Sequence, residues 1–393
     1  MIWPAPPASA SPLEVCIATL ERLVGYATVS ADSNLALIAY LAGLLEEAGA
    51  RVEILSDEGG AKANLWATLG PDAPGGLVLS GHTDVVPVED QDWSSDPFVL
   101  REAQGRLYGR GTCDMKGFIA ACIAALPALA SAARTRPIHF AFTYDEETGC
   151  LGARHLVEHL KAAGAAPDMA LIGEPTLLHI VDGHKGCCEY TTHFHGAEGH
   201  GSRPELGVNA VDYATRYVAR LMELRRDLAA AAPADSPFVP PHTTINVGAL
   251  VGGVAHNVIP GHARLEWEMR PVAWSDAVRV KTDLERFCAE DLLPEMRAVC
   301  PEAGIDMEVV GEVGALEPRS ANGARDLVAS VLGKNGTEVV SFGTEAGLFQ
   351  EIGLDVVVCG PGSIEQAHKP DEYIAVAELD RALSLLHGIA ARY

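Results

Sequence analysis

Apolar runs that alternate between two periods constrain the fold of this 393-residue chain more than any other feature. Short continuous apolar runs are typical of buried strands, and stretches with apolar residues every three or four positions are typical of helices. The strand-like runs are 63–69, 77–80, 138–144, 169–172 and 356–359, and the helix-like runs are 35–45, 115–130, 149–163 and 375–390. This alternation predicts an α/β fold with a mixed, mainly parallel sheet sandwiched by helices.

A different texture occupies residues 183–311. It reads strand, helix, strand, strand, helix, strand, over 189–194, 208–228, 243–250, 263–270, 277–287 and 306–310. That order predicts an α+β unit with a four-stranded antiparallel sheet and two helices. Since the α/β pattern resumes afterwards, we predict a first domain of residues 1–182 and 312–393 that carries an inserted domain, 183–311. The length of the chain also favours two domains, because a chain of this size rarely forms a single hydrophobic core.

Charge and composition exclude several classes of function. The chain has 53 acidic and 29 basic residues, a formal net charge of −24, which disfavours nucleic-acid and anionic membrane partners. The sequence shows no apolar run long enough for a transmembrane helix, and residues 1–12 lack the basic region of a secretory leader. We therefore expect neither membrane insertion nor secretion. The nine scattered cysteines lack Cys-x-x-Cys spacing, which favours reduced thiols and a cytoplasmic location.

Five short clusters carry candidate chemistry. The first holds His82 and Asp84, directly after a strand-like run, and Asp84 could accept one ring N–H and so fix the imidazole tautomer. The second holds Asp114, before a helix-like run, where it could cap the helix or hold two cations together. Taken alone, each of these clusters also fits an ordinary loop or capping role.

The third cluster is Asp145-Glu146-Glu147, after another strand-like run. Carboxylates at a helix start can interact with its dipole, but three in succession repel unless solvent or cations neutralise them. A metal site would let one carboxylate bind while its neighbour stays free as a proton acceptor.

Glu174 and His368, in the fourth and fifth clusters, are unremarkable singly. Their joint placement matters, because most of the clusters follow predicted strands, at the edge of the sheet where sites assemble. Two histidines with three carboxylates suit borderline divalent metals such as zinc or cobalt.

These five blocks, in this order, resemble the metallopeptidase family of acetylornithine deacetylase, succinyl-diaminopimelate desuccinylase, carboxypeptidase G and aminoacylase. The resemblance runs from about residue 35 to the C-terminus. Segments 94–98, 342–346 and 360–368 resemble the acetylornithine deacetylase branch most, although Gly347 stands where that branch would have proline.

The resemblance implies two divalent metal ions, zinc or cobalt, bridged by Asp114. Each ion would take two further ligands, which are His82 and Glu174 for one and Glu147 and His368 for the other. Glu146 would be the general base and acid, and the peptide bond after Asp114 would be cis.

The resemblance also assigns roles to the inserted domain, as a lid and a dimerisation surface of a homodimer. His200 would donate to the oxyanion in a partner subunit's site, and Asn257 and Arg270 would hold the carboxylate of the substrate. A turn histidine and a surface ion pair are the alternatives for His200 and Arg270.

The implied activity is hydrolysis of the acyl amide of N2-acetyl-L-ornithine to L-ornithine and acetate, a step of arginine biosynthesis. The alternatives are deacylation of another N-acyl amino acid, a non-catalytic binding protein that keeps the fold, and phosphoester hydrolysis. The last would need basic groups near the motifs, which this acidic chain offers sparingly.

Overall fold

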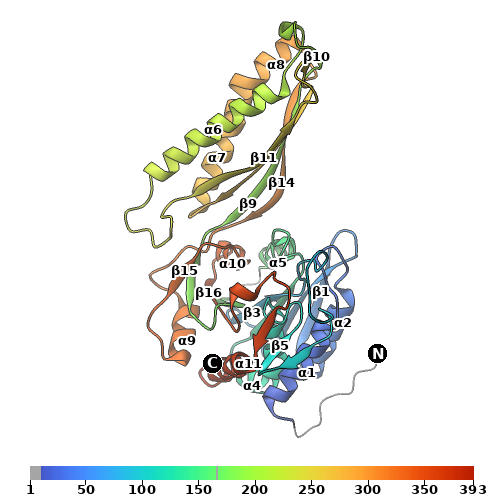
Figure 1. The fold of residues 1–393 in the computed structure, drawn as a ribbon. Coiled ribbons are helices and arrows are strands. Elements are labelled where there is room, and N and C mark those ends of the chain that lie inside the picture. The colour runs from blue at the N-terminus through green and yellow to red at the C-terminus, as the bar shows by residue number, and fades with distance from the viewer. Residues whose placement is uncertain (1–9, 165–166) are drawn as a thin grey trace. The chain divides into compact units, whose positions relative to one another are not determined.

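The computed structural model describes residues 10–164 and 167–393, so most of the N-terminal stretch interpreted above lies outside the described residues. The chain divides into two compact units (Figure 1). The first unit comprises residues 1–183, 318–338 and 344–393, and the second unit comprises 184–317 and 339–343.

An eight-stranded sheet in the order β1-β2-β6-β3-β7-β16-β8-β15 forms the centre of the first unit. Its strands are β1 (Arg51–Ser56), β2 (Ala63–Leu69), β3 (Leu77–His82), β6 (Ile138–Thr143), β7 (Met169–Pro175), β8 (Val181–His184), β15 (Glu338–Val340) and β16 (Asp355–Gly360). Neighbours among β6, β3, β7 and β16 are parallel, whereas β1, β2 and β8 pair antiparallel. The predicted mixed sheet is confirmed.

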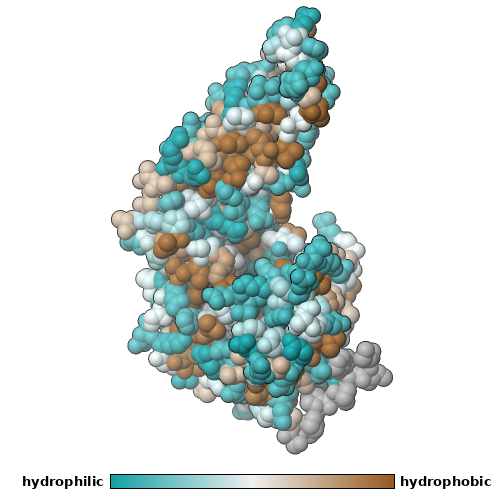
Figure 2. Space-filling view, in the orientation of Figure 1, coloured by the Kyte–Doolittle hydropathy of each residue, from teal (hydrophilic) through white to brown (hydrophobic). Residues whose placement is uncertain are grey.

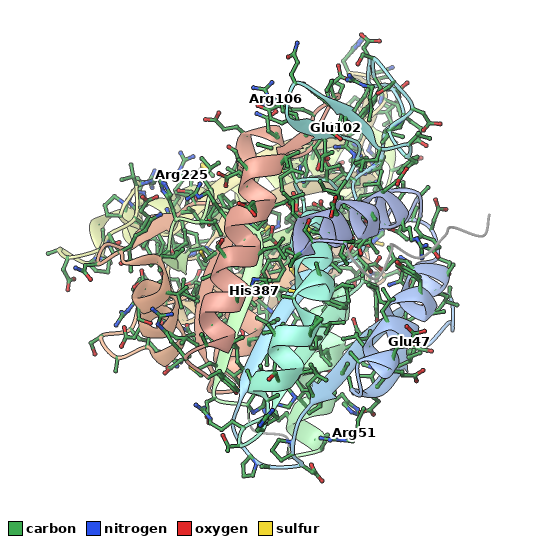
Figure 3. All side chains as sticks on the ribbon, turned by 90° about the horizontal axis from the view of Figure 1, so that it is seen from below. Glu47, Arg51, Glu102, Arg106, Arg225 and His387 are labelled. Atoms are coloured by element: carbon green, nitrogen blue, oxygen red, sulfur yellow. The ribbon has the colours of Figure 1, made fainter. Side chains whose placement is uncertain are left out.

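Helices cover both faces of this sheet. One layer shares a large apolar core with the sheet and consists of α1 (Pro12–Val24), α2 (Leu35–Glu47), α3 (Lys116–Ala124), α4 (Leu126–Ala132), α9 (Gly323–Leu332) and α11 (Val376–Ala390). Figure 3 looks onto this layer from below, with His387 on α11. Against the sheet also pack α5 (Leu151–Ala162) and α10 (Ala346–Glu351), which contact each other. A small sheet of β4 (Arg101–Ala103), β5 (Arg106–Tyr108) and β17 (Tyr373–Ala375) and a 3₁₀ turn (Ile364–Gln366) complete the unit.

The second unit is built on a four-stranded antiparallel sheet in the order β11-β13-β9-β14, as predicted. The strands are β9 (Cys187–His195), β11 (Thr244–Gly252), β13 (His262–Arg270) and β14 (Gly304–Val313). Its apolar core lies against α6 (Ala210–Ala230) and α7 (Trp274–Phe287), and α8 (Leu293–Val299) follows a π-helical turn (Cys288–Leu292). A ribbon of β10 (Gly199–His200) and β12 (Val258–Ile259) stands next to a 3₁₀ turn (Pro204–Leu206).

Several boundaries differ from the sequence expectations. The helix predicted over 115–130 is two helices, because Pro127 has no N–H to continue the hydrogen-bond ladder. The helix predicted from residue 208 begins at Ala210, since the side chain of Asn209 caps it by accepting from Val211 N and Asp212 N. The predicted domain limit at 311/312 falls inside β14, so the second unit continues beyond it and also includes 339–343.

In the described part of the chain, none of the helices combines the length and the apolar character that a membrane crossing requires.

Candidate metal centre

The carboxyl ends of three neighbouring parallel strands bring the first candidate residues together. His82 is the last residue of β3, Glu174 is the second-last residue of β7, and Glu146 and Glu147 follow β6. His82 and Glu174 therefore lie within their strands and not, as predicted, after them. This placement fixes the backbone of both residues, since it belongs to the hydrogen-bonded sheet.

Asp114 lies at the centre of the cluster, with one carboxylate oxygen toward each histidine. Its Oδ1 is 2.9 Å from His82 Nε2, and its Oδ2 is 3.5 Å from His368 Nε2. Beyond the histidines, Glu174 Oε1 is 3.9 Å from His82 Nε2, and Glu147 Oε2 is 3.0 Å from His368 Nε2. The structure thus brings all five predicted ligand residues together, and the Asp114–Met115 peptide bond is cis, as expected.

Burial differs sharply across the cluster. The side chains of His82, Asp114 and Glu174 are 1%, 7% and 6% exposed, whereas that of His368 is 54% exposed. The cluster therefore opens to solvent on the side of His368, which has a left-handed backbone, φ +64°.

The donor set fits divalent cations. Ligand atoms of His82, Asp114 and Glu147 lie within 4.8 Å of one another, which makes this group a candidate metal site. Glu174 Oε1 is buried and has no hydrogen-bond partner among the described residues, which is costly unless a cation or another donor occupies its lone pairs.

Burial, hydrogen bonds and neighbouring charges shift the pKa of the carboxyls of Glu174, Glu147 and Asp114. Burial raises the pKa of Glu174 and of Glu147, and the charge of Asp114 adds to both shifts. Burial also opposes ionisation of Asp114, but hydrogen bonds from His368 and His82 outweigh it and lower the pKa of that carboxyl. The hydrogen bonds of His368 to Asp114 and to Glu147 raise the pKa of the His368 ring to about 10. Cations would relieve this crowding, as expected of a metal cage.

Glu146 stands beside the cage without facing either histidine in a hydrogen bond. Burial raises the pKa of its carboxyl to about 8; His82 opposes this shift, and the charges of Glu147 and Asp114 add to it. Its Oε1 lies 3.4 Å from Cys150 Sγ. A carboxyl with a pKa near neutrality can both accept and return a proton.

Asp84 supports the cluster in a way that the sequence only partly predicted. His82 Nδ1 is nearer to the backbone carbonyl of Asp84, at 2.9 Å, than to its carboxylate, at 3.6 Å. The Asp84 carboxylate instead accepts from Ser30 Oγ at 2.7 Å and from the backbone N–H groups of Glu146 and Glu147. Asp84 therefore positions the whole turn that bears the two glutamates.

Lys62 supports the same turn and was missed by the sequence interpretation. Its Nζ lies 2.6 and 2.7 Å from the two carboxylate oxygens of Asp145, whose φ is +53°, and it also donates to the carbonyl of Ser30. Neither Lys62 nor Ser30 stands in a recognisable motif, so sequence alone gave no signal for these two residues. Arg110 and Glu372 were also missed, although they lie only four residues before Asp114 and four residues after His368.

The remaining predicted site residues belong to the second unit. His200 is exposed on β10, and its Nδ1 accepts from the backbone N–H of Ser202 at 3.2 Å. Nδ1 also lies 2.8 Å from Ser202 Oγ, which can donate to it as the backbone N–H does; a neutral ring that accepts at Nδ1 holds its proton on Nε2. Asn257 lies close by, since its carbonyl accepts from Gly201 N.

Arg270 is placed differently, at the end of β13. Its Nη2 lies 2.6 Å from Glu268 Oε2, so the guanidinium is already engaged in an ion pair within the second unit. This agrees with the alternative of an ion pair, and Arg270 lies on another element than His200 and Asn257.

A cluster of carboxylates and two histidines at the carboxyl edge of a mainly parallel sheet is the kind of site that metal-dependent hydrolases use. The sequence profile of peptidase family M20/M25/M40 matches residues 78–392, and the chain belongs to this family.

Named relatives cover almost the whole chain. It is 39% identical over 386 residues to an acetylornithine deacetylase of Myxococcus xanthus, covering 96% of this chain and 97% of the relative. It is 38% identical over 366 residues to that of Photorhabdus laumondii, covering 91% and 92%.

Solved structures share the fold at low sequence identity. An M20 family metallo-carboxypeptidase from Sulfolobus solfataricus has a TM-score of 0.72 at 18% identity, covering 95% of this chain and 98% of that one. A Bacillus subtilis protein described as a dinuclear metal binding peptidase from the M20 family has a TM-score of 0.63 at 16% identity, covering 97% and 98%.

Proposed function

We propose that this protein hydrolyses the acyl amide of N2-acetyl-L-ornithine to give L-ornithine and acetate. The observation that carries the proposal is the cage around Asp114, with Glu146 beside it, in a chain 38–39% identical to named acetylornithine deacetylases over nearly the full length. The product ornithine suits a role in arginine biosynthesis.

The ligand roles follow the distances in the cage. Asp114 would bridge two divalent ions, because its two oxygens face different histidines. His82 and Glu174 would complete one site, and Glu147 and His368 the other. Mixed nitrogen and oxygen ligands favour zinc, with cobalt as a substitute.

Bound cations would polarise the acyl carbonyl and acidify a water molecule. Glu146 would then accept the proton of the attacking water and return it to the departing amine. Asp84 would keep Glu146 and Glu147 in place through their backbone N–H groups. The Asp84 carbonyl would keep the proton of His82 on Nδ1, which leaves Nε2 free to be a ligand.

The first unit would thus be the catalytic domain and the second unit a lid. His200 would donate from Nε2 to the developing oxyanion, a role supported by the acceptor state of its Nδ1. Asn257 and Arg270 would bind the carboxylate of the substrate; for Arg270 this requires exchange of its partner Glu268.

Self-association through the second unit is also proposed. Apolar side chains gather around β11 and β14 in Figure 2, and these edge strands expose Leu250, Val251, Val309 and Val310. Exposed apolar edges favour a partner, here a second copy. Sedimentation should show that the parent protein is a dimer and that the Val251→Lys variant is a monomer. The control variant Val99→Lys, on the first unit, should remain a dimer. A monomeric parent would refute the dimer.

The nine free cysteines support a cytoplasmic location.

The decisive experiment is substrate profiling of the zinc- or cobalt-reconstituted protein against N-acetylornithine, succinyl-diaminopimelate and N-acyl dipeptides. We expect the highest kcat/KM for N-acetylornithine. A clear preference for a succinyl donor would reject this substrate but keep the reaction class.

Glu146→Gln is the matched control for the chemistry. The amide keeps the size of the side chain but cannot accept the proton, so kcat should fall about 100- to 10,000-fold. Metal content, measured by elemental analysis, should stay at the parent level. Unchanged kcat would remove Glu146 from the mechanism.

A further inference from the structure

The carboxylate of Glu372 accepts four hydrogen bonds from the loop that bears Asp114. Oε1 accepts from the backbone N–H groups of Cys113 and Asp114, at 2.8 and 3.1 Å. Oε2 accepts from Gly111 N at 3.0 Å and from Arg110 Nη1 at 2.8 Å. Both side chains of this ion pair are 1% exposed, so these bonds are made away from water.

Glu372 itself belongs to the other ligand loop, four residues after His368. Its backbone carbonyl accepts from Gly109 N at 3.0 Å, which returns a bond between the same two loops. A buried carboxylate with this many donors has one well-defined position, because any shift would leave buried N–H groups unpaired.

Gln91 closes the connection on the second side. Its Oε1 accepts from Arg110 Nη2 at 2.6 Å, and its Nε2 donates to the backbone carbonyl of His368 at 3.0 Å. A hydrogen-bonded chain therefore runs from the His368 carbonyl through Gln91, Arg110 and Glu372 to the backbone N–H of Asp114.

We propose that Glu372, with Arg110 and Gln91, is a positioning group that sets the separation of Asp114 and His368 and thereby the affinity of the cation site these two residues share with Glu147. The inference rests on the proposed metal sites. His368 lies in a loop and not in a strand of the sheet, its side chain is 54% exposed and its backbone is left-handed, so its position depends on contacts of this loop. The site of His82 and Glu174 depends less on this chain, because both ligands lie in strands of the sheet.

Glu372→Gln tests the proposal. The variant keeps the size of the side chain, but its NH₂ group cannot accept from the donors of the Asp114 loop. Zinc titration of the metal-free protein by calorimetry should give two binding steps in the parent. We expect one of them to weaken about 10- to 100-fold in the variant, the usual cost of removing a group that orients a ligand. The visible spectrum of the cobalt-loaded variant should change for that step alone.

Two further variants make the outcome unambiguous. Gln91→Ala, at a half-buried position, should weaken the same step less and remains informative if Glu372→Gln folds poorly. Asp182→Asn is the matched control, because it alters another buried carboxylate of the first unit, paired with Arg325. It should leave both steps at the parent affinity.

Unchanged binding in both Glu372→Gln and Gln91→Ala would overturn the proposal, and so would equal weakening of both steps. A parent protein that binds no divalent metal would instead overturn the proposed function.

Discussion

At the scale of single residues, the roles of Asp84 show why a motif can be recognised before its mechanics are known. The spacing of His82 and Asp84 predicted that the acidic side chain orients the ring. In the structure the backbone carbonyl is nearer to the ring, and the carboxylate is occupied by Ser30 and by the backbone of Glu146 and Glu147. Asp84 therefore orients the ring of His82 through its main chain and holds the turn of Glu146 and Glu147 through its side chain.

Metal binding at the proposed site of His368 and Glu147 should release protons. In the metal-free protein the pKa of His368 is raised from 6.5 to about 10, so at pH 7–8 this ring carries a proton that a cation must displace. The affinity of the site shared with Glu147 should therefore rise about tenfold per pH unit per proton released, up to about pH 10. Calorimetry in two buffers of different ionisation enthalpy counts the protons.

His368→Gln should bind that cation more weakly and release at least one proton fewer. The folding stability of the metal-free parent should fall as the pH rises, whereas the affinity for the cation should increase. A raised folded-state pKa stabilises the protein below pH 6.5, and this contribution is lost as pH rises toward 10. Metal binding without proton release at pH 7 would contradict the shift.

At the scale of elements, periodicity predicted most of what positions the site. The strand over 63–69 agrees with β2 residue for residue, and the other central strands were placed within a few residues. The helix of residues 12–24 was missed, although it has a capping box at Ser11 and Glu14. The break at Pro127 was missed because the apolar pattern continues across it.

The candidate site divides along the same line. The cluster of the five proposed ligand residues could be predicted because each stands in a motif block that follows a strand or precedes a helix. The groups that hold them could not, since Lys62, Ser30 and Gln91 reach the site only through the tertiary fold. Local sequence shows which side chains can bind a cation, whereas contacts distant in sequence fix where they bind it.

Gly173 on β7 packs too closely against α3 to be replaced by a larger residue. A Cβ at this position would lie 2.0 Å from Cγ and Cδ1 of Phe118 on α3, which is itself buried. Gly173→Ala should therefore destabilise the first unit by about 1–3 kcal/mol, and it should weaken metal binding because Glu174 is the next residue. Denaturant titration of the metal-free protein measures the first effect and zinc calorimetry the second.

Gly43→Ala is the control on α2, where an added Cβ meets nothing within 4 Å. Alanine should stabilise that helix by about 0.5–1 kcal/mol, because glycine loses more backbone entropy on folding. Equal effects of the two substitutions would show that the contact with Phe118 relaxes without cost.

At the scale of the whole molecule, each of the two units has a large hydrophobic core of its own. The larger core belongs to the first unit and lies under the helices that include α1, α3 and α11. The other belongs to the second unit, between its sheet and α6 and α7. All five proposed ligand residues belong to the first unit, so metal binding there would act directly on one core only.

We therefore expect two thermal unfolding transitions in the metal-free protein, of which only one responds to zinc. A ligand that binds only the native state at 100 times its Kd adds about 2.7 kcal/mol, which corresponds to about 5–10 °C for a domain of this size. Calorimetric scans at increasing zinc should raise the transition of the first unit and leave the other in place. His82→Gln should reduce the rise, because it removes a buried ligand, whereas His387→Gln, on α11, should not. A single transition that moves as a whole would show instead that the two cores unfold together and that cation binding stabilises the entire chain.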